Sequence, residues 1–338
     1  MIGNTMKEII YAIFLSFFLC GLCGNAEAKK KKEVKKAIKR EVQTPYDKLF
    51  KGKKAFTVNG LMKMHLMAGK VYAEFPIELL NRDLALTSSI EDISDNGEGV
   101  VGQFAGRVNQ FRFTLQDSML QARLVRRYGV KNTGMGKNAD QIIERSNTPG
   151  IFQSYKILAY TPDKKAVVVD MTELFLESSR LTNPFPSYAG NSLYGFVQRI
   201  HKFQSQRSEL LGICGNDNSM SVRCNLGFNV DRLVLGSFMQ AKDVPVSVTV
   251  NKILMLLPED PMRPRLADSR IGVNAIIQTE LPDVCQGIKT YYITKRWRIE
   301  PVDEIRYKQG EMVDVKKPIV FYIDTLMPDS WKPYIKEG

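Results

Sequence analysis

Hydrophobic and polar residues alternate with a period of two along much of the chain, which is the pattern of half-buried β-strands. Residues 62–66 and 71–75 both alternate in this way, and Ala68-Gly69 between them predicts a tight turn. These two runs are therefore expected to form a β-hairpin. His65 falls on the polar side of the first run, so we expect it to be exposed to solvent rather than to act as a ligand.

The same reasoning predicts further strands. Asp117-Ser118 and the polar run 161–165 are turn signals between alternating segments, so each predicts another hairpin. The strands expected from these patterns cover residues 111–116, 120–124, 153–160, 166–171, 244–257 and 289–299. Helical spacing is scarce and is clearest at Phe196, Ile200 and Phe203. The predicted fold is α+β, with antiparallel strands predominating.

Changes in composition divide the chain into five segments. A break rich in Ser, Asp, Asn and Gly at residues 88–99 separates a small unit from a larger one. The expected segments are a signal peptide (1–28), a basic linker (29–45), a small β-hairpin domain (46–87), a larger antiparallel α+β domain (88–288) and a lead-in to a further domain (289–338).

The N-terminus has the features of an export signal. Residues 9–22 are apolar and uncharged, and Ala26-Glu27-Ala28 matches a signal-peptidase site. The alternative is a lipid anchor on Cys20 or Cys23, but each of these cysteines follows a leucine, where lipidation favours a small residue. We therefore expect export to the periplasm or the cell surface.

The basic charge of the chain is concentrated near this signal. The sequence has 48 Lys and Arg against 36 Asp and Glu, and eight of the basic residues lie within residues 29–40. A nucleic-acid-binding domain spreads its cations over a folded face, so we expect no nucleic-acid partner. Residues 29–40 are interpreted as a solvated tether, and contact with an anionic membrane surface is the second interpretation.

The sequence contains no recognisable catalytic constellation. His65 and His201 are the only histidines, and neither belongs to an H-E-x-x-H motif. A zinc site usually takes three protein ligands, so the chain is poorly equipped to hold zinc by itself. Residues 134–139 fit G-x-G-x-x-A but do not follow an apolar strand, so dinucleotide binding is not expected.

Two cysteines suggest a disulfide. The turn-forming residues 215–219 lie between Cys214 and Cys224, and a hairpin that turned at Ser219 would place the two thiols opposite each other. The alternative is that these cysteines and Cys285 are buried free thiols.

The end of the sequence has the pattern of a domain that begins. Residues 319–323 are expected to form a buried strand, Ser330 is a candidate helix N-cap, and Trp331 and Tyr334 share a helical face. So short a helix is marginal alone, so this pattern is typical of the first strand and first helix of a domain whose remainder is absent.

A family resemblance supports this interpretation. Residues 258–272, 296–301 and 317–338 resemble the region that precedes and enters the catalytic domain of the large secreted zinc-dependent metalloproteases of Bacteroidetes, and the similarity extends back to residues 46–52. The resemblance implies two domains of unknown function ahead of a metzincin-like catalytic domain. It also implies that the C-terminal strand and helix are the start of a truncated, zincin-like domain. The sequence shows no H-E-x-x-H-x-x-G-x-x-H motif, so no zinc ligand or general base carries over, which puts peptidase activity in doubt.

The expected function is therefore that of an exported, non-catalytic N-terminal region that packs against or regulates a peptidase domain supplied in cis or separately. Zinc would belong to that domain and not to this chain. Cys285 or Asp268 could shield the zinc, although a buried thiol and an ion pair of Asp268 with Arg265 or Arg270 are the simpler interpretations. A stand-alone periplasmic or surface binding module is the alternative function.

Overall fold

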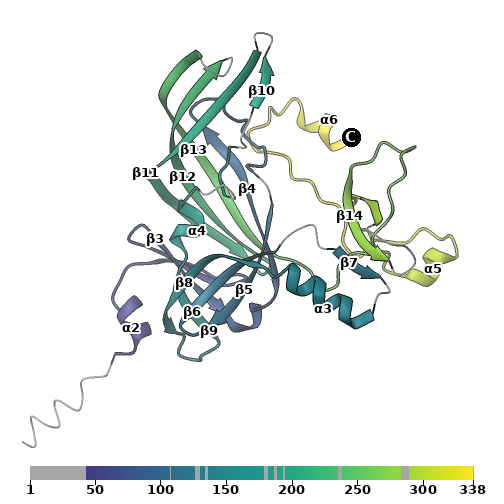
Figure 1. Ribbon diagram of the computed structural model, residues 1–338, viewed down its shortest axis with the longest axis horizontal. Helices are drawn as coiled ribbons and strands as arrows, with labels where there is room; N and C mark the ends of the chain where they lie inside the picture. The colour runs from purple at the N-terminus through teal and green to yellow at the C-terminus, as the bar shows by residue number, and fades with distance from the viewer. Residues whose placement is uncertain are drawn as a thin grey trace, which may run out of the picture.

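The computed structural model describes residues 43–337, except for residues 107, 126–129, 134–135, 179–181, 186–188, 193–194, 235–237 and 283–288. The largest part of the fold is one antiparallel sheet, shown in Figure 1. Its twelve strands lie in the order β1-β2-β3-β9-β8-β6-β5-β4-β13-β12-β11-β10. The predicted α+β class with predominantly antiparallel strands is confirmed.

The strands of the large sheet differ greatly in length. Those of one half are short or medium: β1 Phe56–Val58, β2 Lys63–Met67, β3 Lys70–Pro76, β4 Asp83–Ile93, β5 Asn109–Gln116, β6 Met119–Val125, β8 Gly150–Tyr160 and β9 Ala166–Asp170. The other half contains β10 Ala189–Ser192 and three long strands, β11 Gly195–Asn216, β12 Ser219–Val234 and β13 Phe238–Leu256. The long strands project beyond the compact half of the sheet (Figure 1).

Two-residue turns join two of the three predicted hairpins, and residues 161–165 join the third. Ala68 and Gly69 both have positive φ between β2 and β3, and Asp117 has φ 51° between β5 and β6. Left-handed turn residues match the twist of paired strands, so these hairpins could be recognised from local pattern alone.

The remaining elements lie outside the large sheet. A three-stranded sheet in the order β15-β14-β7 contains β7 Val130–Thr133, β14 Ala275–Pro282 and β15 Lys289–Thr294, with β14 parallel to β7. The helices are α2 Pro45–Phe50, the 3-10 helix η1 Ile77–Leu79, α3 Gly136–Ser146, α4 Thr172–Leu176, α5 Glu304–Lys308 and α6 Lys332–Glu337. No helix in the described residues is both long enough and apolar enough to span a membrane.

The large sheet curls so that its β1–β2 end meets the β11–β12 hairpin. The Leu61 amide donates to the Asn216 carbonyl at 2.7 Å, and a Cβ on Gly60 would lie only 2.7 Å from the same oxygen. Only glycine allows so close an approach of two backbones. This contact encloses the main apolar core.

Two clusters of buried side chains form the core. The first fills the curled half and includes Phe75, Phe111, Phe113 and Phe175. The second lies along the long strands and includes Phe228, Val248 and Val250. Alternate residues of β12 and β13 point into these clusters, as period-two patterning requires.

The structure corrects three predictions of secondary structure. Phe196, Ile200 and Phe203 belong to strand β11 and not to a helix, because pairing with β12 overrides the local spacing. The predicted break at residues 88–99 begins too early, because β4 continues to Ile93 and the predicted boundary at 87/88 falls inside that strand.

The third correction concerns the C-terminal segment. Residues 319–323 belong to no helix or strand, and they have no backbone partner strand in the described residues. The predicted short helix is present as α6. The apolar run alone therefore did not produce a strand, because a strand requires a neighbour to satisfy its backbone groups.

Candidate functional site

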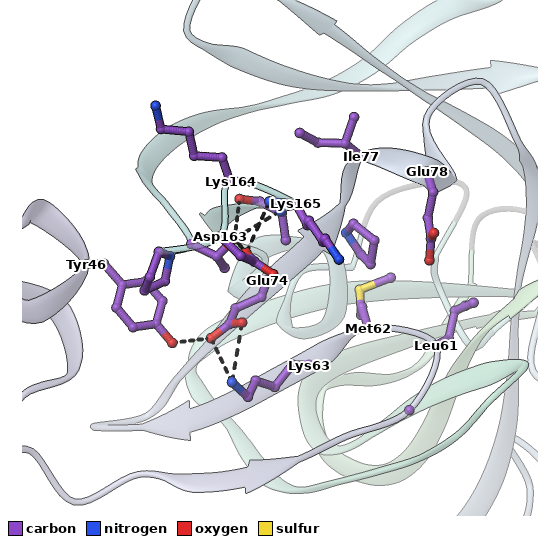
Figure 2. Close-up of a pocket in the computed structure, with 15 residues that line it drawn as sticks. Tyr46, Leu61, Met62, Lys63, Glu74, Ile77, Glu78, Asp163, Lys164 and Lys165 are labelled. Carbon is purple, nitrogen blue, oxygen red and sulfur yellow. Dashed lines mark hydrogen bonds and ion pairs between the residues drawn. The ribbon is translucent and has the colours of Figure 1, made fainter.

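A pocket lies where α2, the β2–β3 hairpin and the turn after β8 meet, as Figure 2 shows. Its volume is about 820 Å³. Charged side chains of both signs surround an apolar floor that includes Met62. The charged lining residues are Lys63, Glu74, Glu78, Asp163, Lys164 and Lys165.

Glu74 is the polar centre of the wall of this pocket. Its carboxylate accepts a hydrogen bond from the Tyr46 hydroxyl at 2.6 Å and one from His65 Nε2 at 2.9 Å. Lys63 Nζ lies 3.4 Å from the same oxygen. Glu74 is only 7% exposed, so a nearly buried carboxylate is held by three donors.

The β2–β3 register and helix α2 build this cluster together. Register pairs Lys63 directly with Glu74, and His65 lies two residues further along the same face of β2. The Phe50 ring of α2 covers the His65 ring with centroids 4.4 Å apart, and Thr57 Oγ1 lies 2.8 Å from His65 Nδ1. The prediction of an exposed His65 is therefore wrong: the residue is 6% exposed, because α2 covers the polar face of the hairpin and Thr57 of the adjacent strand β1 lies beside His65.

The electrostatics make Glu74 an anion and Tyr46 a neutral donor. Burial raises the pKa of Glu74, but the hydrogen bonds from His65 and Tyr46 and the charge of Lys63 outweigh it and leave that pKa below its ordinary value. Burial and the neighbouring Glu74 carboxylate raise the pKa of Tyr46. The acceptor capacity of Glu74 is largely used within the protein, so the cluster can anchor α2 to the sheet more readily than it can act as a free base.

The second histidine lies in a similar environment on the long strands. His201 Nε2 donates to Glu98 at 2.8 Å, and Arg232 Nη2 lies 2.9 Å from the other oxygen of that carboxylate. The Phe185 ring stacks on the His201 ring at 4.3 Å. Burial and the charges of Arg199 and Arg232 lower the pKa of His201, although Glu98 opposes them. Each histidine of the chain is thus hydrogen-bonded to a buried glutamate and covered by a phenylalanine.

A lysine is buried between the two core clusters. Lys252 of β13 is 0% exposed, and its Nζ donates to the Glu177 carbonyl at 3.0 Å, at the C-terminus of α4. Burial lowers the pKa of Lys252 to about 8. The sequence could have indicated this burial, because Val250, Lys252 and Leu254 are alternate residues and therefore share the inward face of the strand.

The cysteines do not pair as predicted. Both Cys214 and Cys224 are free. The hairpin turns between Asn216 and Ser219, so Cys214 lies opposite Ser221, and a register shift places Cys224 opposite Leu210. The predicted disulfide does not form, because the turn lies closer to Cys214 than the predicted turn at Ser219. Cys224 instead points into the core.

Of the two candidate zinc-shielding residues, the structure describes only Asp268. Asp268 accepts hydrogen bonds from Arg270 Nε at 2.9 Å and from Arg270 Nη2 at 2.5 Å, and these contacts lower its pKa. This is one of the two ion pairs that the sequence suggested for Asp268. Cys285 lies outside the described residues. No group of three or more His, Cys, Asp or Glu residues in the described part of the chain is arranged to hold a metal ion.

Residues 136–139 of the G-x-G-x-x-A run begin helix α3, and residues 134–135 lie outside the described residues. Strand β7 precedes this run and α3 begins within it. The chain then enters β8 of the large sheet rather than a strand parallel to β7. In the described residues, this connection therefore does not form the βαβ unit that binds dinucleotides.

The C-terminal segment presents the most unusual surface. Within the described part of residues 255–337, no residue is buried. The exposed side chains include large apolar groups that normally lie inside proteins: Trp297, Ile305, Met312, Phe321, Tyr322, Leu326, Trp331 and Tyr334. Exposed apolar area on this scale is uncommon on the surface of a soluble monomer.

This segment is attached to the large sheet at its beginning. Leu257 N donates to the Asp83 carbonyl at 2.9 Å, and Arg82 Nη1 pairs with Glu259 at 2.7 Å. Further along, the Trp297 and Phe321 rings meet edge to face at 6.3 Å. The segment therefore begins at a defined position but has few apolar neighbours of its own.

Comparison with known proteins identifies two domains without an assigned role. A family model described as domain of unknown function (DUF5117) matches residues 102–302, and a second, described as domain of unknown function (DUF5118), matches residues 43–93. No curated protein and no solved structure matches the chain.

Proposed function

We propose that this chain, which belongs to the DUF5117 family, is the exported, non-catalytic N-terminal region of a zinc-dependent metalloprotease and packs against the peptidase domain. Two adjoining domains of unknown function agree with the arrangement that the sequence resemblance implies. The metalloprotease link itself rests on that resemblance.

The observation that carries the proposal is the exposed apolar surface of residues 255–337. Phe321 is 79% exposed and Tyr322 is 93% exposed, although both would favour burial. Burying one such side chain stabilises a complex by about 1.5–3 kcal/mol. A partner that covers these residues would gain several such contributions, and the resembled family places a catalytic domain next to this segment.

Hydrogen exchange with a partner domain tests the proposal. The purified chain is mixed with a separately produced zinc-peptidase domain of the resembled family, and amide exchange is followed by mass spectrometry. We expect residues 317–337 to become protected on mixing, while the exchange of β12 stays unchanged. Absence of a complex, or protection elsewhere only, would contradict the proposal.

A matched pair of variants distinguishes specific docking from nonspecific hydrophobic association. Phe321→Ala should weaken the complex, because it removes an apolar contact on the proposed surface. Phe104→Ala removes an equally exposed phenylalanine (76%) from the loop after β4 and should leave the complex unchanged.

A stand-alone binding module is the second candidate, and the pocket beside Glu74 favours it. A volume of about 820 Å³ lies in the range of small-molecule sites. Reading the coding sequence beyond Gly338 separates the candidates, because an H-E-x-x-H motif downstream in frame supports the metalloprotease region. The pocket candidate instead predicts a small ligand that stabilises the isolated chain against heat.

A further inference from the structure

A second, smaller pocket lies within the C-terminal segment, beside strand β15. Its volume is about 480 Å³, and its lining combines an apolar part, Ile276 and Ile293, with a basic part made by Arg263, Arg265, Lys295 and Arg296. We call this hollow the arginine pocket and define it by those six residues.

The arginine pocket differs from the rest of the segment in its lack of counter-charges. The other arginines of the segment, Arg270, Arg298 and Arg306, each pair with a nearby carboxylate. No ion pair to a described carboxylate is made by Arg263, Arg265 or Arg296. Cations gathered around one hollow repel each other, so a ligand that brings negative charge is favoured there.

The backbone holds these cations in place. Arg296 Nη2 donates to the Arg263 carbonyl at 2.8 Å, and Thr294 N donates to the Arg265 carbonyl at 2.9 Å. The stretch around Arg265 thus runs along the outer edge of β15, where Leu266 pairs with Ile293. Because this edge is occupied, recognition would occur through side chains rather than by addition of a strand.

We propose that the arginine pocket binds an acidic and apolar segment of the partner protein, with carboxylates on Arg263, Arg265 and Arg296 and an apolar side chain against Ile276 and Ile293. Guanidinium groups bind carboxylates through two parallel hydrogen bonds, which gives geometric selectivity. The apolar part favours a peptide over a purely polar polyanion. This inference rests on the proposed function, since it names the chemistry of the partner surface.

Peptide binding by the full chain tests this chemistry directly. The probe is a fluorescent peptide of alternating glutamate and leucine, measured by anisotropy against the same peptide with glutamine in place of glutamate. We expect the glutamate peptide to bind at least about tenfold more tightly than the glutamine peptide, because hydrogen bonds to charged groups contribute more than those between neutral groups. Binding should weaken as salt is added.

Variants locate the binding. Arg263→Gln and Arg296→Gln should each weaken binding of the glutamate peptide by about tenfold. Arg270→Gln and Arg306→Gln are the controls, since these arginines already pair with carboxylates, and should leave binding unchanged. Equal loss in the control variants, equal binding of the glutamine peptide, or tighter binding of heparin than of the glutamate peptide would overturn the inference.

The same variants distinguish this inference from the proposed function. A complex with the peptidase domain that survives Arg263→Gln and Arg296→Gln unchanged overturns the arginine pocket and leaves the proposed function standing. Selective binding of the glutamate peptide without any complex supports the pocket chemistry and contradicts the proposed partner.

Discussion

The carboxylate of Glu74 and the imidazole of His65 lie 2.9 Å apart on neighbouring strands, and both side chains are almost completely buried. The pair connects the β2–β3 hairpin to helix α2, because Tyr46 donates to the same carboxylate and Phe50 covers the imidazole.

Replacing Glu74 should therefore loosen the N-terminal part of the fold. We expect Glu74→Gln to lower the free energy of unfolding by about 1.5–3 kcal/mol, the usual contribution of hydrogen bonds to a charged group. The folded-state pKa of Glu74 is lowered, so its stabilisation is present above the unfolded pKa and is lost as pH falls through the lower folded value. The variant should lose this acid dependence, as urea unfolding at several pH values can measure.

Glu78→Gln is the matched control for that experiment. Glu78 lines the same pocket but is exposed, so its replacement should change stability little. A similar loss of stability in both variants would contradict a special role for Glu74.

Gly60 should tolerate no side chain. In Gly60→Ala the new Cβ would lie 2.7 Å from the Asn216 carbonyl oxygen and would separate the two backbones that close the sheet. We expect a destabilisation of about 1–3 kcal/mol, the cost of overpacking. Gly150→Ala is the control, because a Cβ there meets no atom within 4 Å. Thermal unfolding compares the two, and equal melting temperatures would contradict the close contact.

Because of Lys252, the free energy of unfolding should increase with pH in the alkaline range. Its folded pKa of about 8 lies below the unfolded value, so the unfolded state binds more protons between these two values. Stability should therefore rise as pH increases from about 8, by about 3 kcal/mol in total.

Lys252→Met should remove this rise and should stabilise the protein at neutral pH by about 1–3 kcal/mol, because it replaces a buried charge by an apolar chain of similar size. Lys242→Met changes an exposed lysine of the same strand and serves as control. Chemical unfolding at pH values on both sides of about 8 measures the difference. A variant less stable than the wild type at neutral pH would show that the hydrogen bond to Glu177 outweighs the burial of charge.

The two described cysteines should react at very different rates. Cys214 is exposed, whereas burial raises the pKa of Cys224 to about 11. Thiolate is the reactive form, so alkylation of the native protein should modify Cys214 and spare Cys224 until the chain unfolds. Peptide mapping without reduction is the measurement, with Cys214→Ser as control. Recovery of a linked peptide containing both residues would contradict the register of β11 and β12.

The isolated chain should show neither peptidase activity nor tight zinc binding. Its two histidines are each hydrogen-bonded to a glutamate on different parts of the sheet, and the sequence contains no H-E-x-x-H motif. Three protein ligands are the usual minimum for catalytic zinc. Metal analysis after dialysis, together with a casein assay, checks this prediction. One zinc retained per chain with casein hydrolysis would refute it.

Local pattern determined the parts of this fold that depend on neighbours in sequence. The β2–β3, β5–β6 and β8–β9 hairpins follow from period-two alternation and short turns, and the antiparallel α+β class follows from their number. The exposed Trp331 and Tyr334 were also recognisable as residues that need a partner.

Tertiary contacts alone decided the rest. His65 became buried because α2 covers a face that is polar in sequence and β1 pairs beside it. The helical spacing of Phe196, Ile200 and Phe203 was overridden by the pairing of β11 with β12. The Glu74 and Glu98 clusters join residues far apart in the chain, and the arginine pocket forms only when residues near Arg263 meet β15. Periodicity reports which face of a strand is apolar, but only the packed chain determines what covers that face.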